Sequence, residues 1–186
     1  IYRLNTFLES KDFDFINEDI GELVDESSEG LNRVSEIVSG LKLFSRVDSD
    51  DRQLFDINAC LKTTLNMVKN ELKYDCDIET DFGKLPKTLI NVGQLNQVFT
   101  NLLINAGHAI KASQNFGKLR LATKSDASHI YVEVEDNGTG MSEETLHKIF
   151  NPFFTTKPEG SGTGLGLSIS FGIIEDHGGS LSAKSK

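Results

Sequence analysis

Two glycine-rich stretches decide the fold of this chain: Asp136-Asn137-Gly138-Thr139-Gly140 and Gly162-Thr163-Gly164-Leu165-Gly166-Leu167. Glycine lets the main chain approach a ligand closely and adopt positive φ without a Cβ clash. Each stretch leads toward a helix-like segment, and a helix start offers unpaired N–H groups and a positive dipole end to phosphate. Asp136 follows the alternating run 130–135, where a carboxylate can accept from the amino group of a base. The two turns together predict a nucleotide held largely by backbone.

Neither stretch fits the common phosphate-binding motifs. No segment supplies the P-loop pattern of glycine, four residues, glycine, lysine and then serine or threonine. A Rossmann fingerprint needs its glycines straight after a strand, whereas Gly162, Gly164 and Gly166 alternate after the loop-like residues 157–161. Ordinary turns remain the alternative for either glycine pair alone, but two such turns around a phenylalanine-rich loop favour a nucleotide site.

The composition is that of a soluble globular protein of 186 residues, with 38% hydrophobic and 25% charged residues. The sequence contains no apolar run of about 18 residues and no signal peptide. Its net charge of −9 argues against nucleic-acid binding. Cys60 and Cys76 fit no metal-site spacing and indicate small thiols in a reducing compartment. We therefore expect a cytoplasmic piece of a longer protein without membrane contact of its own; an anchor outside this chain stays open.

The N-terminal part predicts helices. Apolar residues recur every three or four positions from about 13 to 45, as a helix with one apolar stripe requires. A helix of this length needs partner helices to cover its stripe, so we expect it to serve in assembly. Residues 1–10 are expected to end a preceding helix, and the charge-rich residues 47–54 form the predicted linker.

The remaining residues alternate between strand and helix patterns. Asn58 is the predicted N-cap of a helix to about 74, and Ser142 that of a short helix to 150. Further helices are expected at 93–112 and 165–177, the last one closed by Gly178 and Gly179. Strands are expected at 54–57, 77–82, 89–92, 118–124, 129–135 and 181–184. This mixture predicts an α+β fold, a two-layer α/β sandwich, with a helical arm in front.

Polar residues interrupt the apolar helix at 93–112. Asn101 and Asn105 are one turn apart and His108 follows, so all three can share a face. Surface asparagines are the alternative, but carbonyl oxygens also suit Mg²⁺. The segment 149–157 combines aromatic residues with Thr155, Thr156 and Lys157, which predicts a lid. Plain hydrophobic anchoring of a long loop, and a solvated lysine, remain open at this point.

The four segments together resemble a known family. Residues 101–106 look like the N box of sensor histidine kinases, and 150–154 look like their F box. Residues 136–140 and 162–167 resemble their two glycine boxes, and all four occur in the family's order. The resemblance implies the Bergerat (GHKL) ATP-binding fold, shared with gyrase, Hsp90 and MutL proteins. It also implies three parts: a partial dimerisation hairpin at 1–46, a linker at 47–54 and a catalytic domain at 55–186 that lacks its last strand.

The resemblance implies a role for each matching residue. Asp136 would accept from the adenine amino group, with Gly138 and Gly140 shaping the floor of the base pocket. Asn105 would bind Mg²⁺, and Asn101 and His108 would act near the phosphates as the catalytic pair. The remaining nucleotide-binding residues belong to the lid and the helix start that close over ATP: Phe150, Thr155, Thr156, Lys157, Gly162, Gly164, Leu165, Gly166 and Leu167.

The implied activity is that of a histidine protein kinase in a two-component system. Such a homodimer transfers the γ-phosphoryl group of Mg-ATP to a hairpin histidine, and a response regulator aspartate receives it next. Residues 1–10 contain no histidine, so the acceptor is expected outside this chain. A GHKL ATPase is the first alternative, but those enzymes carry a water-activating Glu where this chain has Asn101. The helical arm disfavours an anti-sigma-type serine kinase, and the four intact boxes disfavour a scaffold with a degenerate site.

Overall fold

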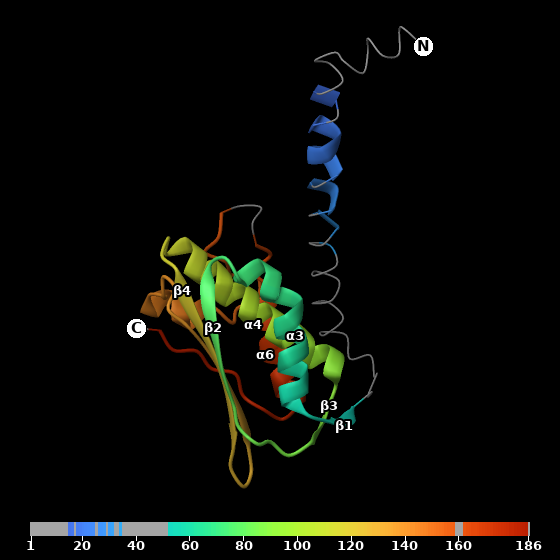
Figure 1. The fold of residues 1–186 in the computed structure, drawn as a ribbon, viewed down its shortest axis with the longest axis vertical. Helices are drawn as coiled ribbons and strands as arrows, with labels where there is room; N and C mark the ends of the chain where they lie inside the picture. Colours follow the sequence, from blue (N-terminus) through green and yellow to red (C-terminus); the bar gives the residue numbers. More distant parts are fainter. Residues whose placement is uncertain are drawn as a thin grey trace.

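The computed structural model describes residues 15–16, 18–24, 26–28, 30–31, 34, 52–158 and 162–185. Beyond residue 51, helices cover one face of a β-sheet (Figure 1). The strand residues alternate between apolar and polar, which leaves one sheet face for a helical cover and the other for water. The predicted α+β fold, a two-layer α/β sandwich, is confirmed.

The main sheet, as far as the chain is described, has three strands in the order β2 (Cys76–Phe82), β4 (Gly117–Ser125) and β5 (Ile130–Asp136). β2 is parallel to β4, whereas β4 and β5 form an antiparallel hairpin. A second, two-stranded antiparallel sheet pairs β1 (Gln53–Phe55) with β3 (Thr88–Ile90). Asp136 ends β5 opposite Leu119, so the glycine turn that follows begins near the start of β4.

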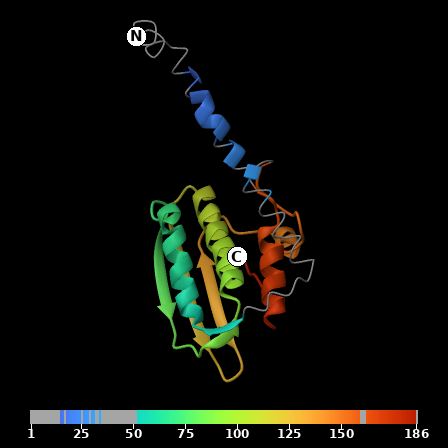
Figure 2. The ribbon, with the colours of Figure 1, turned by 90° about the vertical axis from the view of Figure 1, so that its right-hand side faces the viewer.

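Helices α3 (Ile57–Leu72), α4 (Val92–Ala112) and α6 (Gly166–Asp176) lie side by side on the sheet (Figure 2). α4 is the central one, because it contacts α3 on one side and α6 on the other. Its residues Val98 and Phe99 pack in one core cluster with α6, and Leu103 and Ile110 pack in a second cluster with β4. The short helix α5 (Glu143–Lys148) lies outside both clusters. Because α4 joins both clusters, its polar residues are fixed relative to the sheet and to α6.

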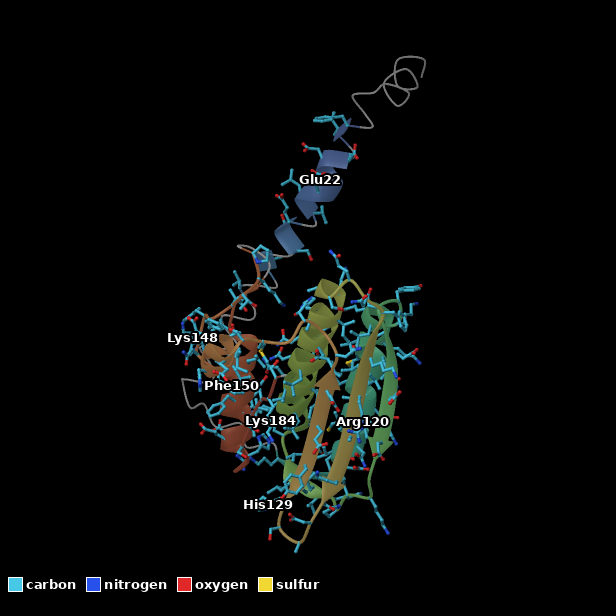
Figure 3. All side chains as sticks on the ribbon, turned by 90° about the vertical axis from the view of Figure 1, so that its left-hand side faces the viewer. Glu22, Arg120, His129, Lys148, Phe150 and Lys184 are labelled. Carbon is cyan, nitrogen blue, oxygen red and sulfur yellow. The ribbon has the colours of Figure 1, made fainter. Side chains whose placement is uncertain are left out.

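The outer face of the sheet carries charges in place of a helical cover. Arg120 on β4 lies 3.4 Å from the Asp81 carboxylate on β2 and 3.6 Å from the Glu135 carboxylate on β5. Lys124 and Glu133 pair in the same way at 2.9 Å. Figure 3 shows Arg120 on the strand layer, away from the helices. Opposite charges on neighbouring strands keep this face soluble without a partner layer.

The helix caps correct one prediction and confirm another. The N-cap of α3 is Asp56 and not Asn58, because the Asp56 carboxylate accepts a 2.9 Å hydrogen bond from the Asn58 N–H. The Asn58 side chain instead links the residue after β2 to β4, donating to the Gly83 carbonyl and accepting from the Thr123 hydroxyl. The Ser142 cap of α5 is confirmed by its contact with the Thr145 N–H. Asp56 and Asn58 are both of a residue type that caps helices, and the tertiary contacts of Asn58 decide which of the two is the N-cap.

Two further predictions differ at the ends of the domain. The strand predicted at 181–184 does not form, since residues 181–185 make no strand ladder. Near that end, the Ser185 hydroxyl accepts a 2.7 Å hydrogen bond from the Met141 N–H, a side-chain contact where a ladder would need backbone pairs. β1 begins at Gln53, inside the range 47–54 predicted as a linker, of which residues 47–51 lie outside the described part.

The predicted N-terminal helix is described only in part. All described residues between 15 and 34 are helical and exposed, and in Figure 1 they extend away from the sandwich. Their apolar side chains include Ile20 and Leu23, each more than half exposed. The predicted end of a preceding helix at 1–10, and residues 13–14 and 35–45, lie outside the described residues. No helix of the described part is both long and apolar enough to cross a membrane.

His177 joins the end of α6 to the start of α4. Its Nδ1 lies 2.8 Å from the Ile173 carbonyl oxygen, and its Nε2 lies 3.1 Å from the backbone nitrogen of Asn91. A carbonyl can only accept, so Nδ1 carries the proton and Nε2 accepts from the Asn91 N–H. Asn91 is itself the N-cap of α4. One imidazole therefore ties the two helices on which the candidate site is built.

We predict that His177→Ala lowers the free energy of unfolding by about 1–3 kcal/mol, because the partly buried Asn91 N–H and the Ile173 carbonyl each lose their side-chain partner. Urea denaturation measures the change. His147→Ala is the matched control, since His147 is exposed on α5. Equal midpoints for the His177 and His147 variants would contradict the role of the imidazole.

Candidate functional site

Helix α4 carries the three polar residues predicted near the phosphates. Asn101, Asn105 and His108 follow one another at spacings of four and three, so they share one face of the helix. Asn101 and Asn105 are half-buried, and His108 is exposed. Leu103 and Ile110 are fully buried against the sheet and hold the helix in place. The polar face is thus presented by a helix that cannot rotate without opening the core.

The turn after β5 begins with Asp136. This residue is exposed, and one of its carboxylate oxygens accepts a 2.9 Å hydrogen bond from the Gly138 N–H. The Asn137 side chain accepts from the Lys118 N–H at 2.6 Å, which ties the turn to the start of β4. Within the described residues the second carboxylate oxygen of Asp136 has no partner. A fixed carboxylate with an available oxygen is suited to accept from a ligand amino group.

Gly138 rests directly on the backbone of α4. A Cβ at this position would lie 2.4 Å from the carbonyl carbon of Ala109, so no other residue fits without a shift. The next residue, Thr139, donates its N–H to the Ala109 carbonyl at 3.2 Å. Gly140 has a φ of +66°, in the left-handed region that favours glycine. The turn and α4 therefore form one continuous backbone surface.

The phenylalanine-rich segment leans on α6. The ring of Phe150 packs against that of Phe171 on α6, with 5.4 Å between the ring centroids. Phe153 has a φ of +65° and is 70% exposed. Gly164, with a φ of +67°, faces Phe153 so closely that a Cβ would lie 2.4 Å from its carbonyl carbon. The two ends of the lid, near 153 and 164, are therefore in backbone contact.

The lid residues between these ends are described up to 158 and again from 162. The Thr155 hydroxyl accepts a 3.1 Å hydrogen bond from the Lys157 N–H. Gly162 lies against Thr155 and Lys157, since a Cβ built there would meet both side chains at 3.1 Å. Thr155 and Thr156 are exposed, whereas Lys157 is half-buried. Thr155, the Lys157 side chain and Gly162 thus lie together.

The start of α6 has one long side-chain contact, in which the Thr163 hydroxyl accepts from the Leu165 N–H at 3.4 Å. Leu165 takes the N-cap position with a helical backbone and no capping hydrogen bond from its own side chain. Its side chain is 5% exposed and anchors the helix start in the core. Gly166 and Leu167 follow half-buried in the first turn. Because the N-cap residue itself has no capping side chain, the N–H groups of the first turn and the positive dipole end are suited to an anion.

Lys157 reaches α4 from the lid. Its Nζ lies 2.7 Å from Nδ1 of His108. An ammonium group can only donate, so His108 accepts through an unprotonated Nδ1. Although His108 is exposed as a whole, partial desolvation of its side chain lowers its pKa, and the Lys157 charge lowers it further. Near neutral pH this contact therefore joins one cation to one neutral imidazole, one turn beyond Asn105.

Asn101 connects α4 to α6. Its Nδ2 donates to the Gly166 carbonyl at 3.0 Å and to the Ser170 hydroxyl at 3.2 Å. Asn105 lies between this contact and the His108–Lys157 contact, and its side chain has no hydrogen bond within the described residues. The structure thus gathers the predicted asparagines, His108, Lys157 and the second glycine stretch along α4.

Not every predicted residue joins this group. Phe150 contacts α6 through Phe171, and Thr156 is exposed without a hydrogen bond inside the described part.

Two neighbours of the candidate site were not predicted from the sequence. Ala109 acts through its carbonyl, which no side-chain pattern reveals. Ser170 had a signal, because a hydroxyl stood at an apolar position of the predicted last helix.

Comparisons with known proteins point to one family. Residues 91–186 match the family described as "Histidine kinase-, DNA gyrase B-, and HSP90-like ATPase". Sensor kinase CckA of Brucella abortus (strain 2308) is 34% identical over 81% of this chain, which corresponds to 17% of CckA. The chain therefore spans less than a fifth of that relative.

Solved structures give the same result. The catalytic domain of histidine kinase ThkA is 30% identical, with a TM-score of 0.59 over 68% of this chain and 81% of that one. ThkA in complex with response regulator protein TrrA is 25% identical, with a TM-score of 0.68 over 96% of this chain and 49% of that one. The family match covers just over half of the chain and includes α4 and both glycine stretches, so the chain belongs to the histidine kinase-, DNA gyrase B- and HSP90-like ATPase family.

Proposed function

We propose that this chain is the catalytic, ATP-binding part of a sensor histidine kinase in a bacterial two-component system. It binds Mg-ATP and transfers the γ-phosphoryl group to a histidine of the dimerisation hairpin. An aspartate of a response regulator then receives the group. The catalytic domain occupies 55–186, after a partial hairpin at 1–46 and a linker at 47–54. The observation that carries the proposal is that both glycine stretches contact helix α4, one at Ala109 and the other at Asn101.

The turn after β5 is the proposed base-binding side. Asp136 keeps one carboxylate oxygen for the adenine amino group while Gly138 N–H holds the other. Gly138 and Gly140 supply a floor without side chains, because Gly138 already touches the α4 backbone. This arrangement fits a flat base that enters from the open side of the turn. Recognition through one amino group also predicts discrimination against bases that lack it.

The phosphate side lies between α4 and the start of α6. The N–H groups of Gly166 and Leu167, next to Leu165 at the start of α6, and the Lys157 ammonium group fit a polyphosphate. Asn105 supplies one carbonyl oxygen, the kind of ligand Mg²⁺ takes alongside phosphate oxygens. No cluster of three His, Cys, Asp or Glu side chains capable of holding a metal occurs among the described residues. The metal would therefore depend on the nucleotide for most of its ligands.

The remaining residues position the reacting group and screen it from water. When bound, Mg²⁺ neutralises charge that develops on the phosphates. Lys157 brings a second positive charge from the lid, and His108 holds its ammonium group over α4. Phe150, Thr155, Thr156, Gly162 and Gly164 form the closing segment. Position 101 is Asn, which cannot act as the general base for water, and this favours transfer over hydrolysis.

The proposed partners follow from the family and from the arm. Ile20 and Leu23 are exposed apolar residues of the N-terminal helix, and a second copy of the hairpin would cover them in a homodimer. The complex of the similar kinase ThkA with response regulator TrrA supports a receiver domain as the next partner. Such a partnership places the catalytic part in the bacterial cytoplasm.

We predict that residues 1–186 incubated with γ-labelled ATP take up no acid-labile label, since all four histidines lie in the ATP-binding half. A longer form that includes the acceptor histidine of the hairpin is expected to take up label that is lost in acid and stable in base. Acid-labile label on the short chain alone would contradict the assignment. Release of inorganic phosphate without any labelled protein would favour an ATPase.

We predict that Asp136→Asn weakens ATP binding at least ~tenfold, because an amide replaces the charged acceptor of the amino group. Calorimetry with ATP and with inosine triphosphate, which lacks that amino group, measures the effect. The wild type should prefer ATP, and the variant should lose the preference. Glu135→Gln is the control, since Glu135 pairs with Arg120 on the outer sheet face. Equal ATP affinity in wild type and Asp136→Asn would refute the base assignment.

A further inference from the structure

Ser170 is a buried hydroxyl that the proposed mechanism does not use. It lies in the second turn of α6, and its side chain has no exposed surface. Its Oγ donates a 2.8 Å hydrogen bond to the Gly166 carbonyl, one turn back on the same helix. The same Oγ lies 3.2 Å from Nδ2 of Asn101 on α4. A buried hydroxyl with two partners on two helices is costly to disturb, so its arrangement constrains both.

The three groups fix the orientation of the Asn101 amide. The Gly166 carbonyl oxygen can only accept, and it faces Asn101 at 3.0 Å, so the atom facing it must be Nδ2. Ser170 gives its proton to the same carbonyl and therefore accepts from Nδ2. Both amide protons are directed to α6. The carbonyl oxygen Oδ1 of Asn101 is consequently on the side turned away from these partners.

The same contacts fix the first turn of α6 against α4. Gly166 is the first residue of α6, and its carbonyl accepts from two side chains, one of them on α4. A Cβ at Gly166 would make ordinary contacts of 3.5 Å or more with Asn101, so hydrogen bonding and not crowding sets this junction. The N–H groups proposed to meet phosphate belong to this turn. A shift of the turn would displace them.

We propose that Ser170 is a positioning residue for the nucleotide site. It orients Asn101 as an acceptor toward the nucleotide side, and it holds the start of α6 where its N–H groups meet the triphosphate. This role rests on the proposed binding of ATP. Because the junction lies on the phosphate side, Ser170 affects the affinity for phosphates and leaves the affinity for the base unchanged.

Ser170→Ala tests the proposal, with Ser168→Ala as the matched control. The Ser168 hydroxyl also bonds one turn back, to the Leu165 carbonyl at 2.9 Å, but it has no hydrogen bond to α4. Calorimetry would measure the dissociation constants of a non-hydrolysable ATP analogue with Mg²⁺ and of adenosine, which has no phosphates. Thermal unfolding shows whether each variant is folded. If Ser170→Ala is not folded, Ser170→Cys, whose side chain is close in volume to serine, takes its place.

We expect Ser170→Ala to weaken the triphosphate analogue about three- to tenfold, the effect of one lost hydrogen bond, with adenosine unchanged. Ser168→Ala should leave both constants unchanged. Equal loss for analogue and adenosine, or no loss in a folded Ser170 variant, would overturn the positioning role alone. Failure of the wild type to bind the analogue would overturn the proposed function first, and this role with it.

A readout without nucleotide separates orientation from stability. In the wild type, both side-chain amide protons of Asn101 are hydrogen-bonded, so their exchange with water should be slow in nuclear magnetic resonance spectra. Ser170→Ala should speed this exchange at Asn101 and leave Asn105 unchanged, because Asn105 has no hydrogen bond within the described residues. Unchanged exchange at Asn101 would show that Ser170 does not orient the amide.

Discussion

The contact between Gly138 and the backbone of Ala109 is the constraint on which the rest of the site depends. It places the turn after β5 on α4 with no side chain between them. A methyl group there would force strand and helix apart, and overpacking of this kind typically costs about 1–3 kcal/mol. The Thr139 N–H closes the contact on the Ala109 carbonyl. The contact therefore holds the Asp136 carboxylate, at the start of this turn, close to one end of α4.

The other contacts of α4 extend this constraint toward the lid. Asn101 binds the start of α6, and His177 ties the end of α6 back to the start of α4. The lid ends meet where Gly164 faces Phe153, whose positive φ costs about 1–3 kcal/mol. Such a conformation persists only where the surroundings hold it, and here Phe153 lies in backbone contact with the left-handed Gly164. The turn after β5, on the proposed base side, and the start of α6 with its lid, on the proposed phosphate side, are therefore both held by α4.

Much of the fold could be predicted from the sequence, because the deciding signals are local. The apolar spacing of α4, the alternation of β4 and β5, and the Ser142 cap each depend on residues close in the chain. The N-cap of α3 could not be predicted, since Asp56 and Asn58 both suit a cap and only Gly83 and Thr123 decide between them. The strand at 181–184 also failed, because four alternating residues do not specify a pairing partner.

The candidate site divides in the same way. Asn105, Asp136 and the glycines were predicted because their residue types are unusual at those positions. The partners that hold them, the Ala109 carbonyl and the Ser170 hydroxyl, act through atoms whose importance comes only from the packing of distant segments. The sequence therefore indicates candidate ligand-binding groups more readily than it indicates the groups that position them.

The most direct measurement is a crystal structure of this chain with a non-hydrolysable ATP analogue and Mg²⁺. We expect the adenine amino nitrogen about 3 Å from an Asp136 carboxylate oxygen. We also expect the metal on the Asn105 carbonyl oxygen, with the phosphates at the start of α6. A nucleotide bound elsewhere, or bound here with its base away from Asp136, would contradict the account.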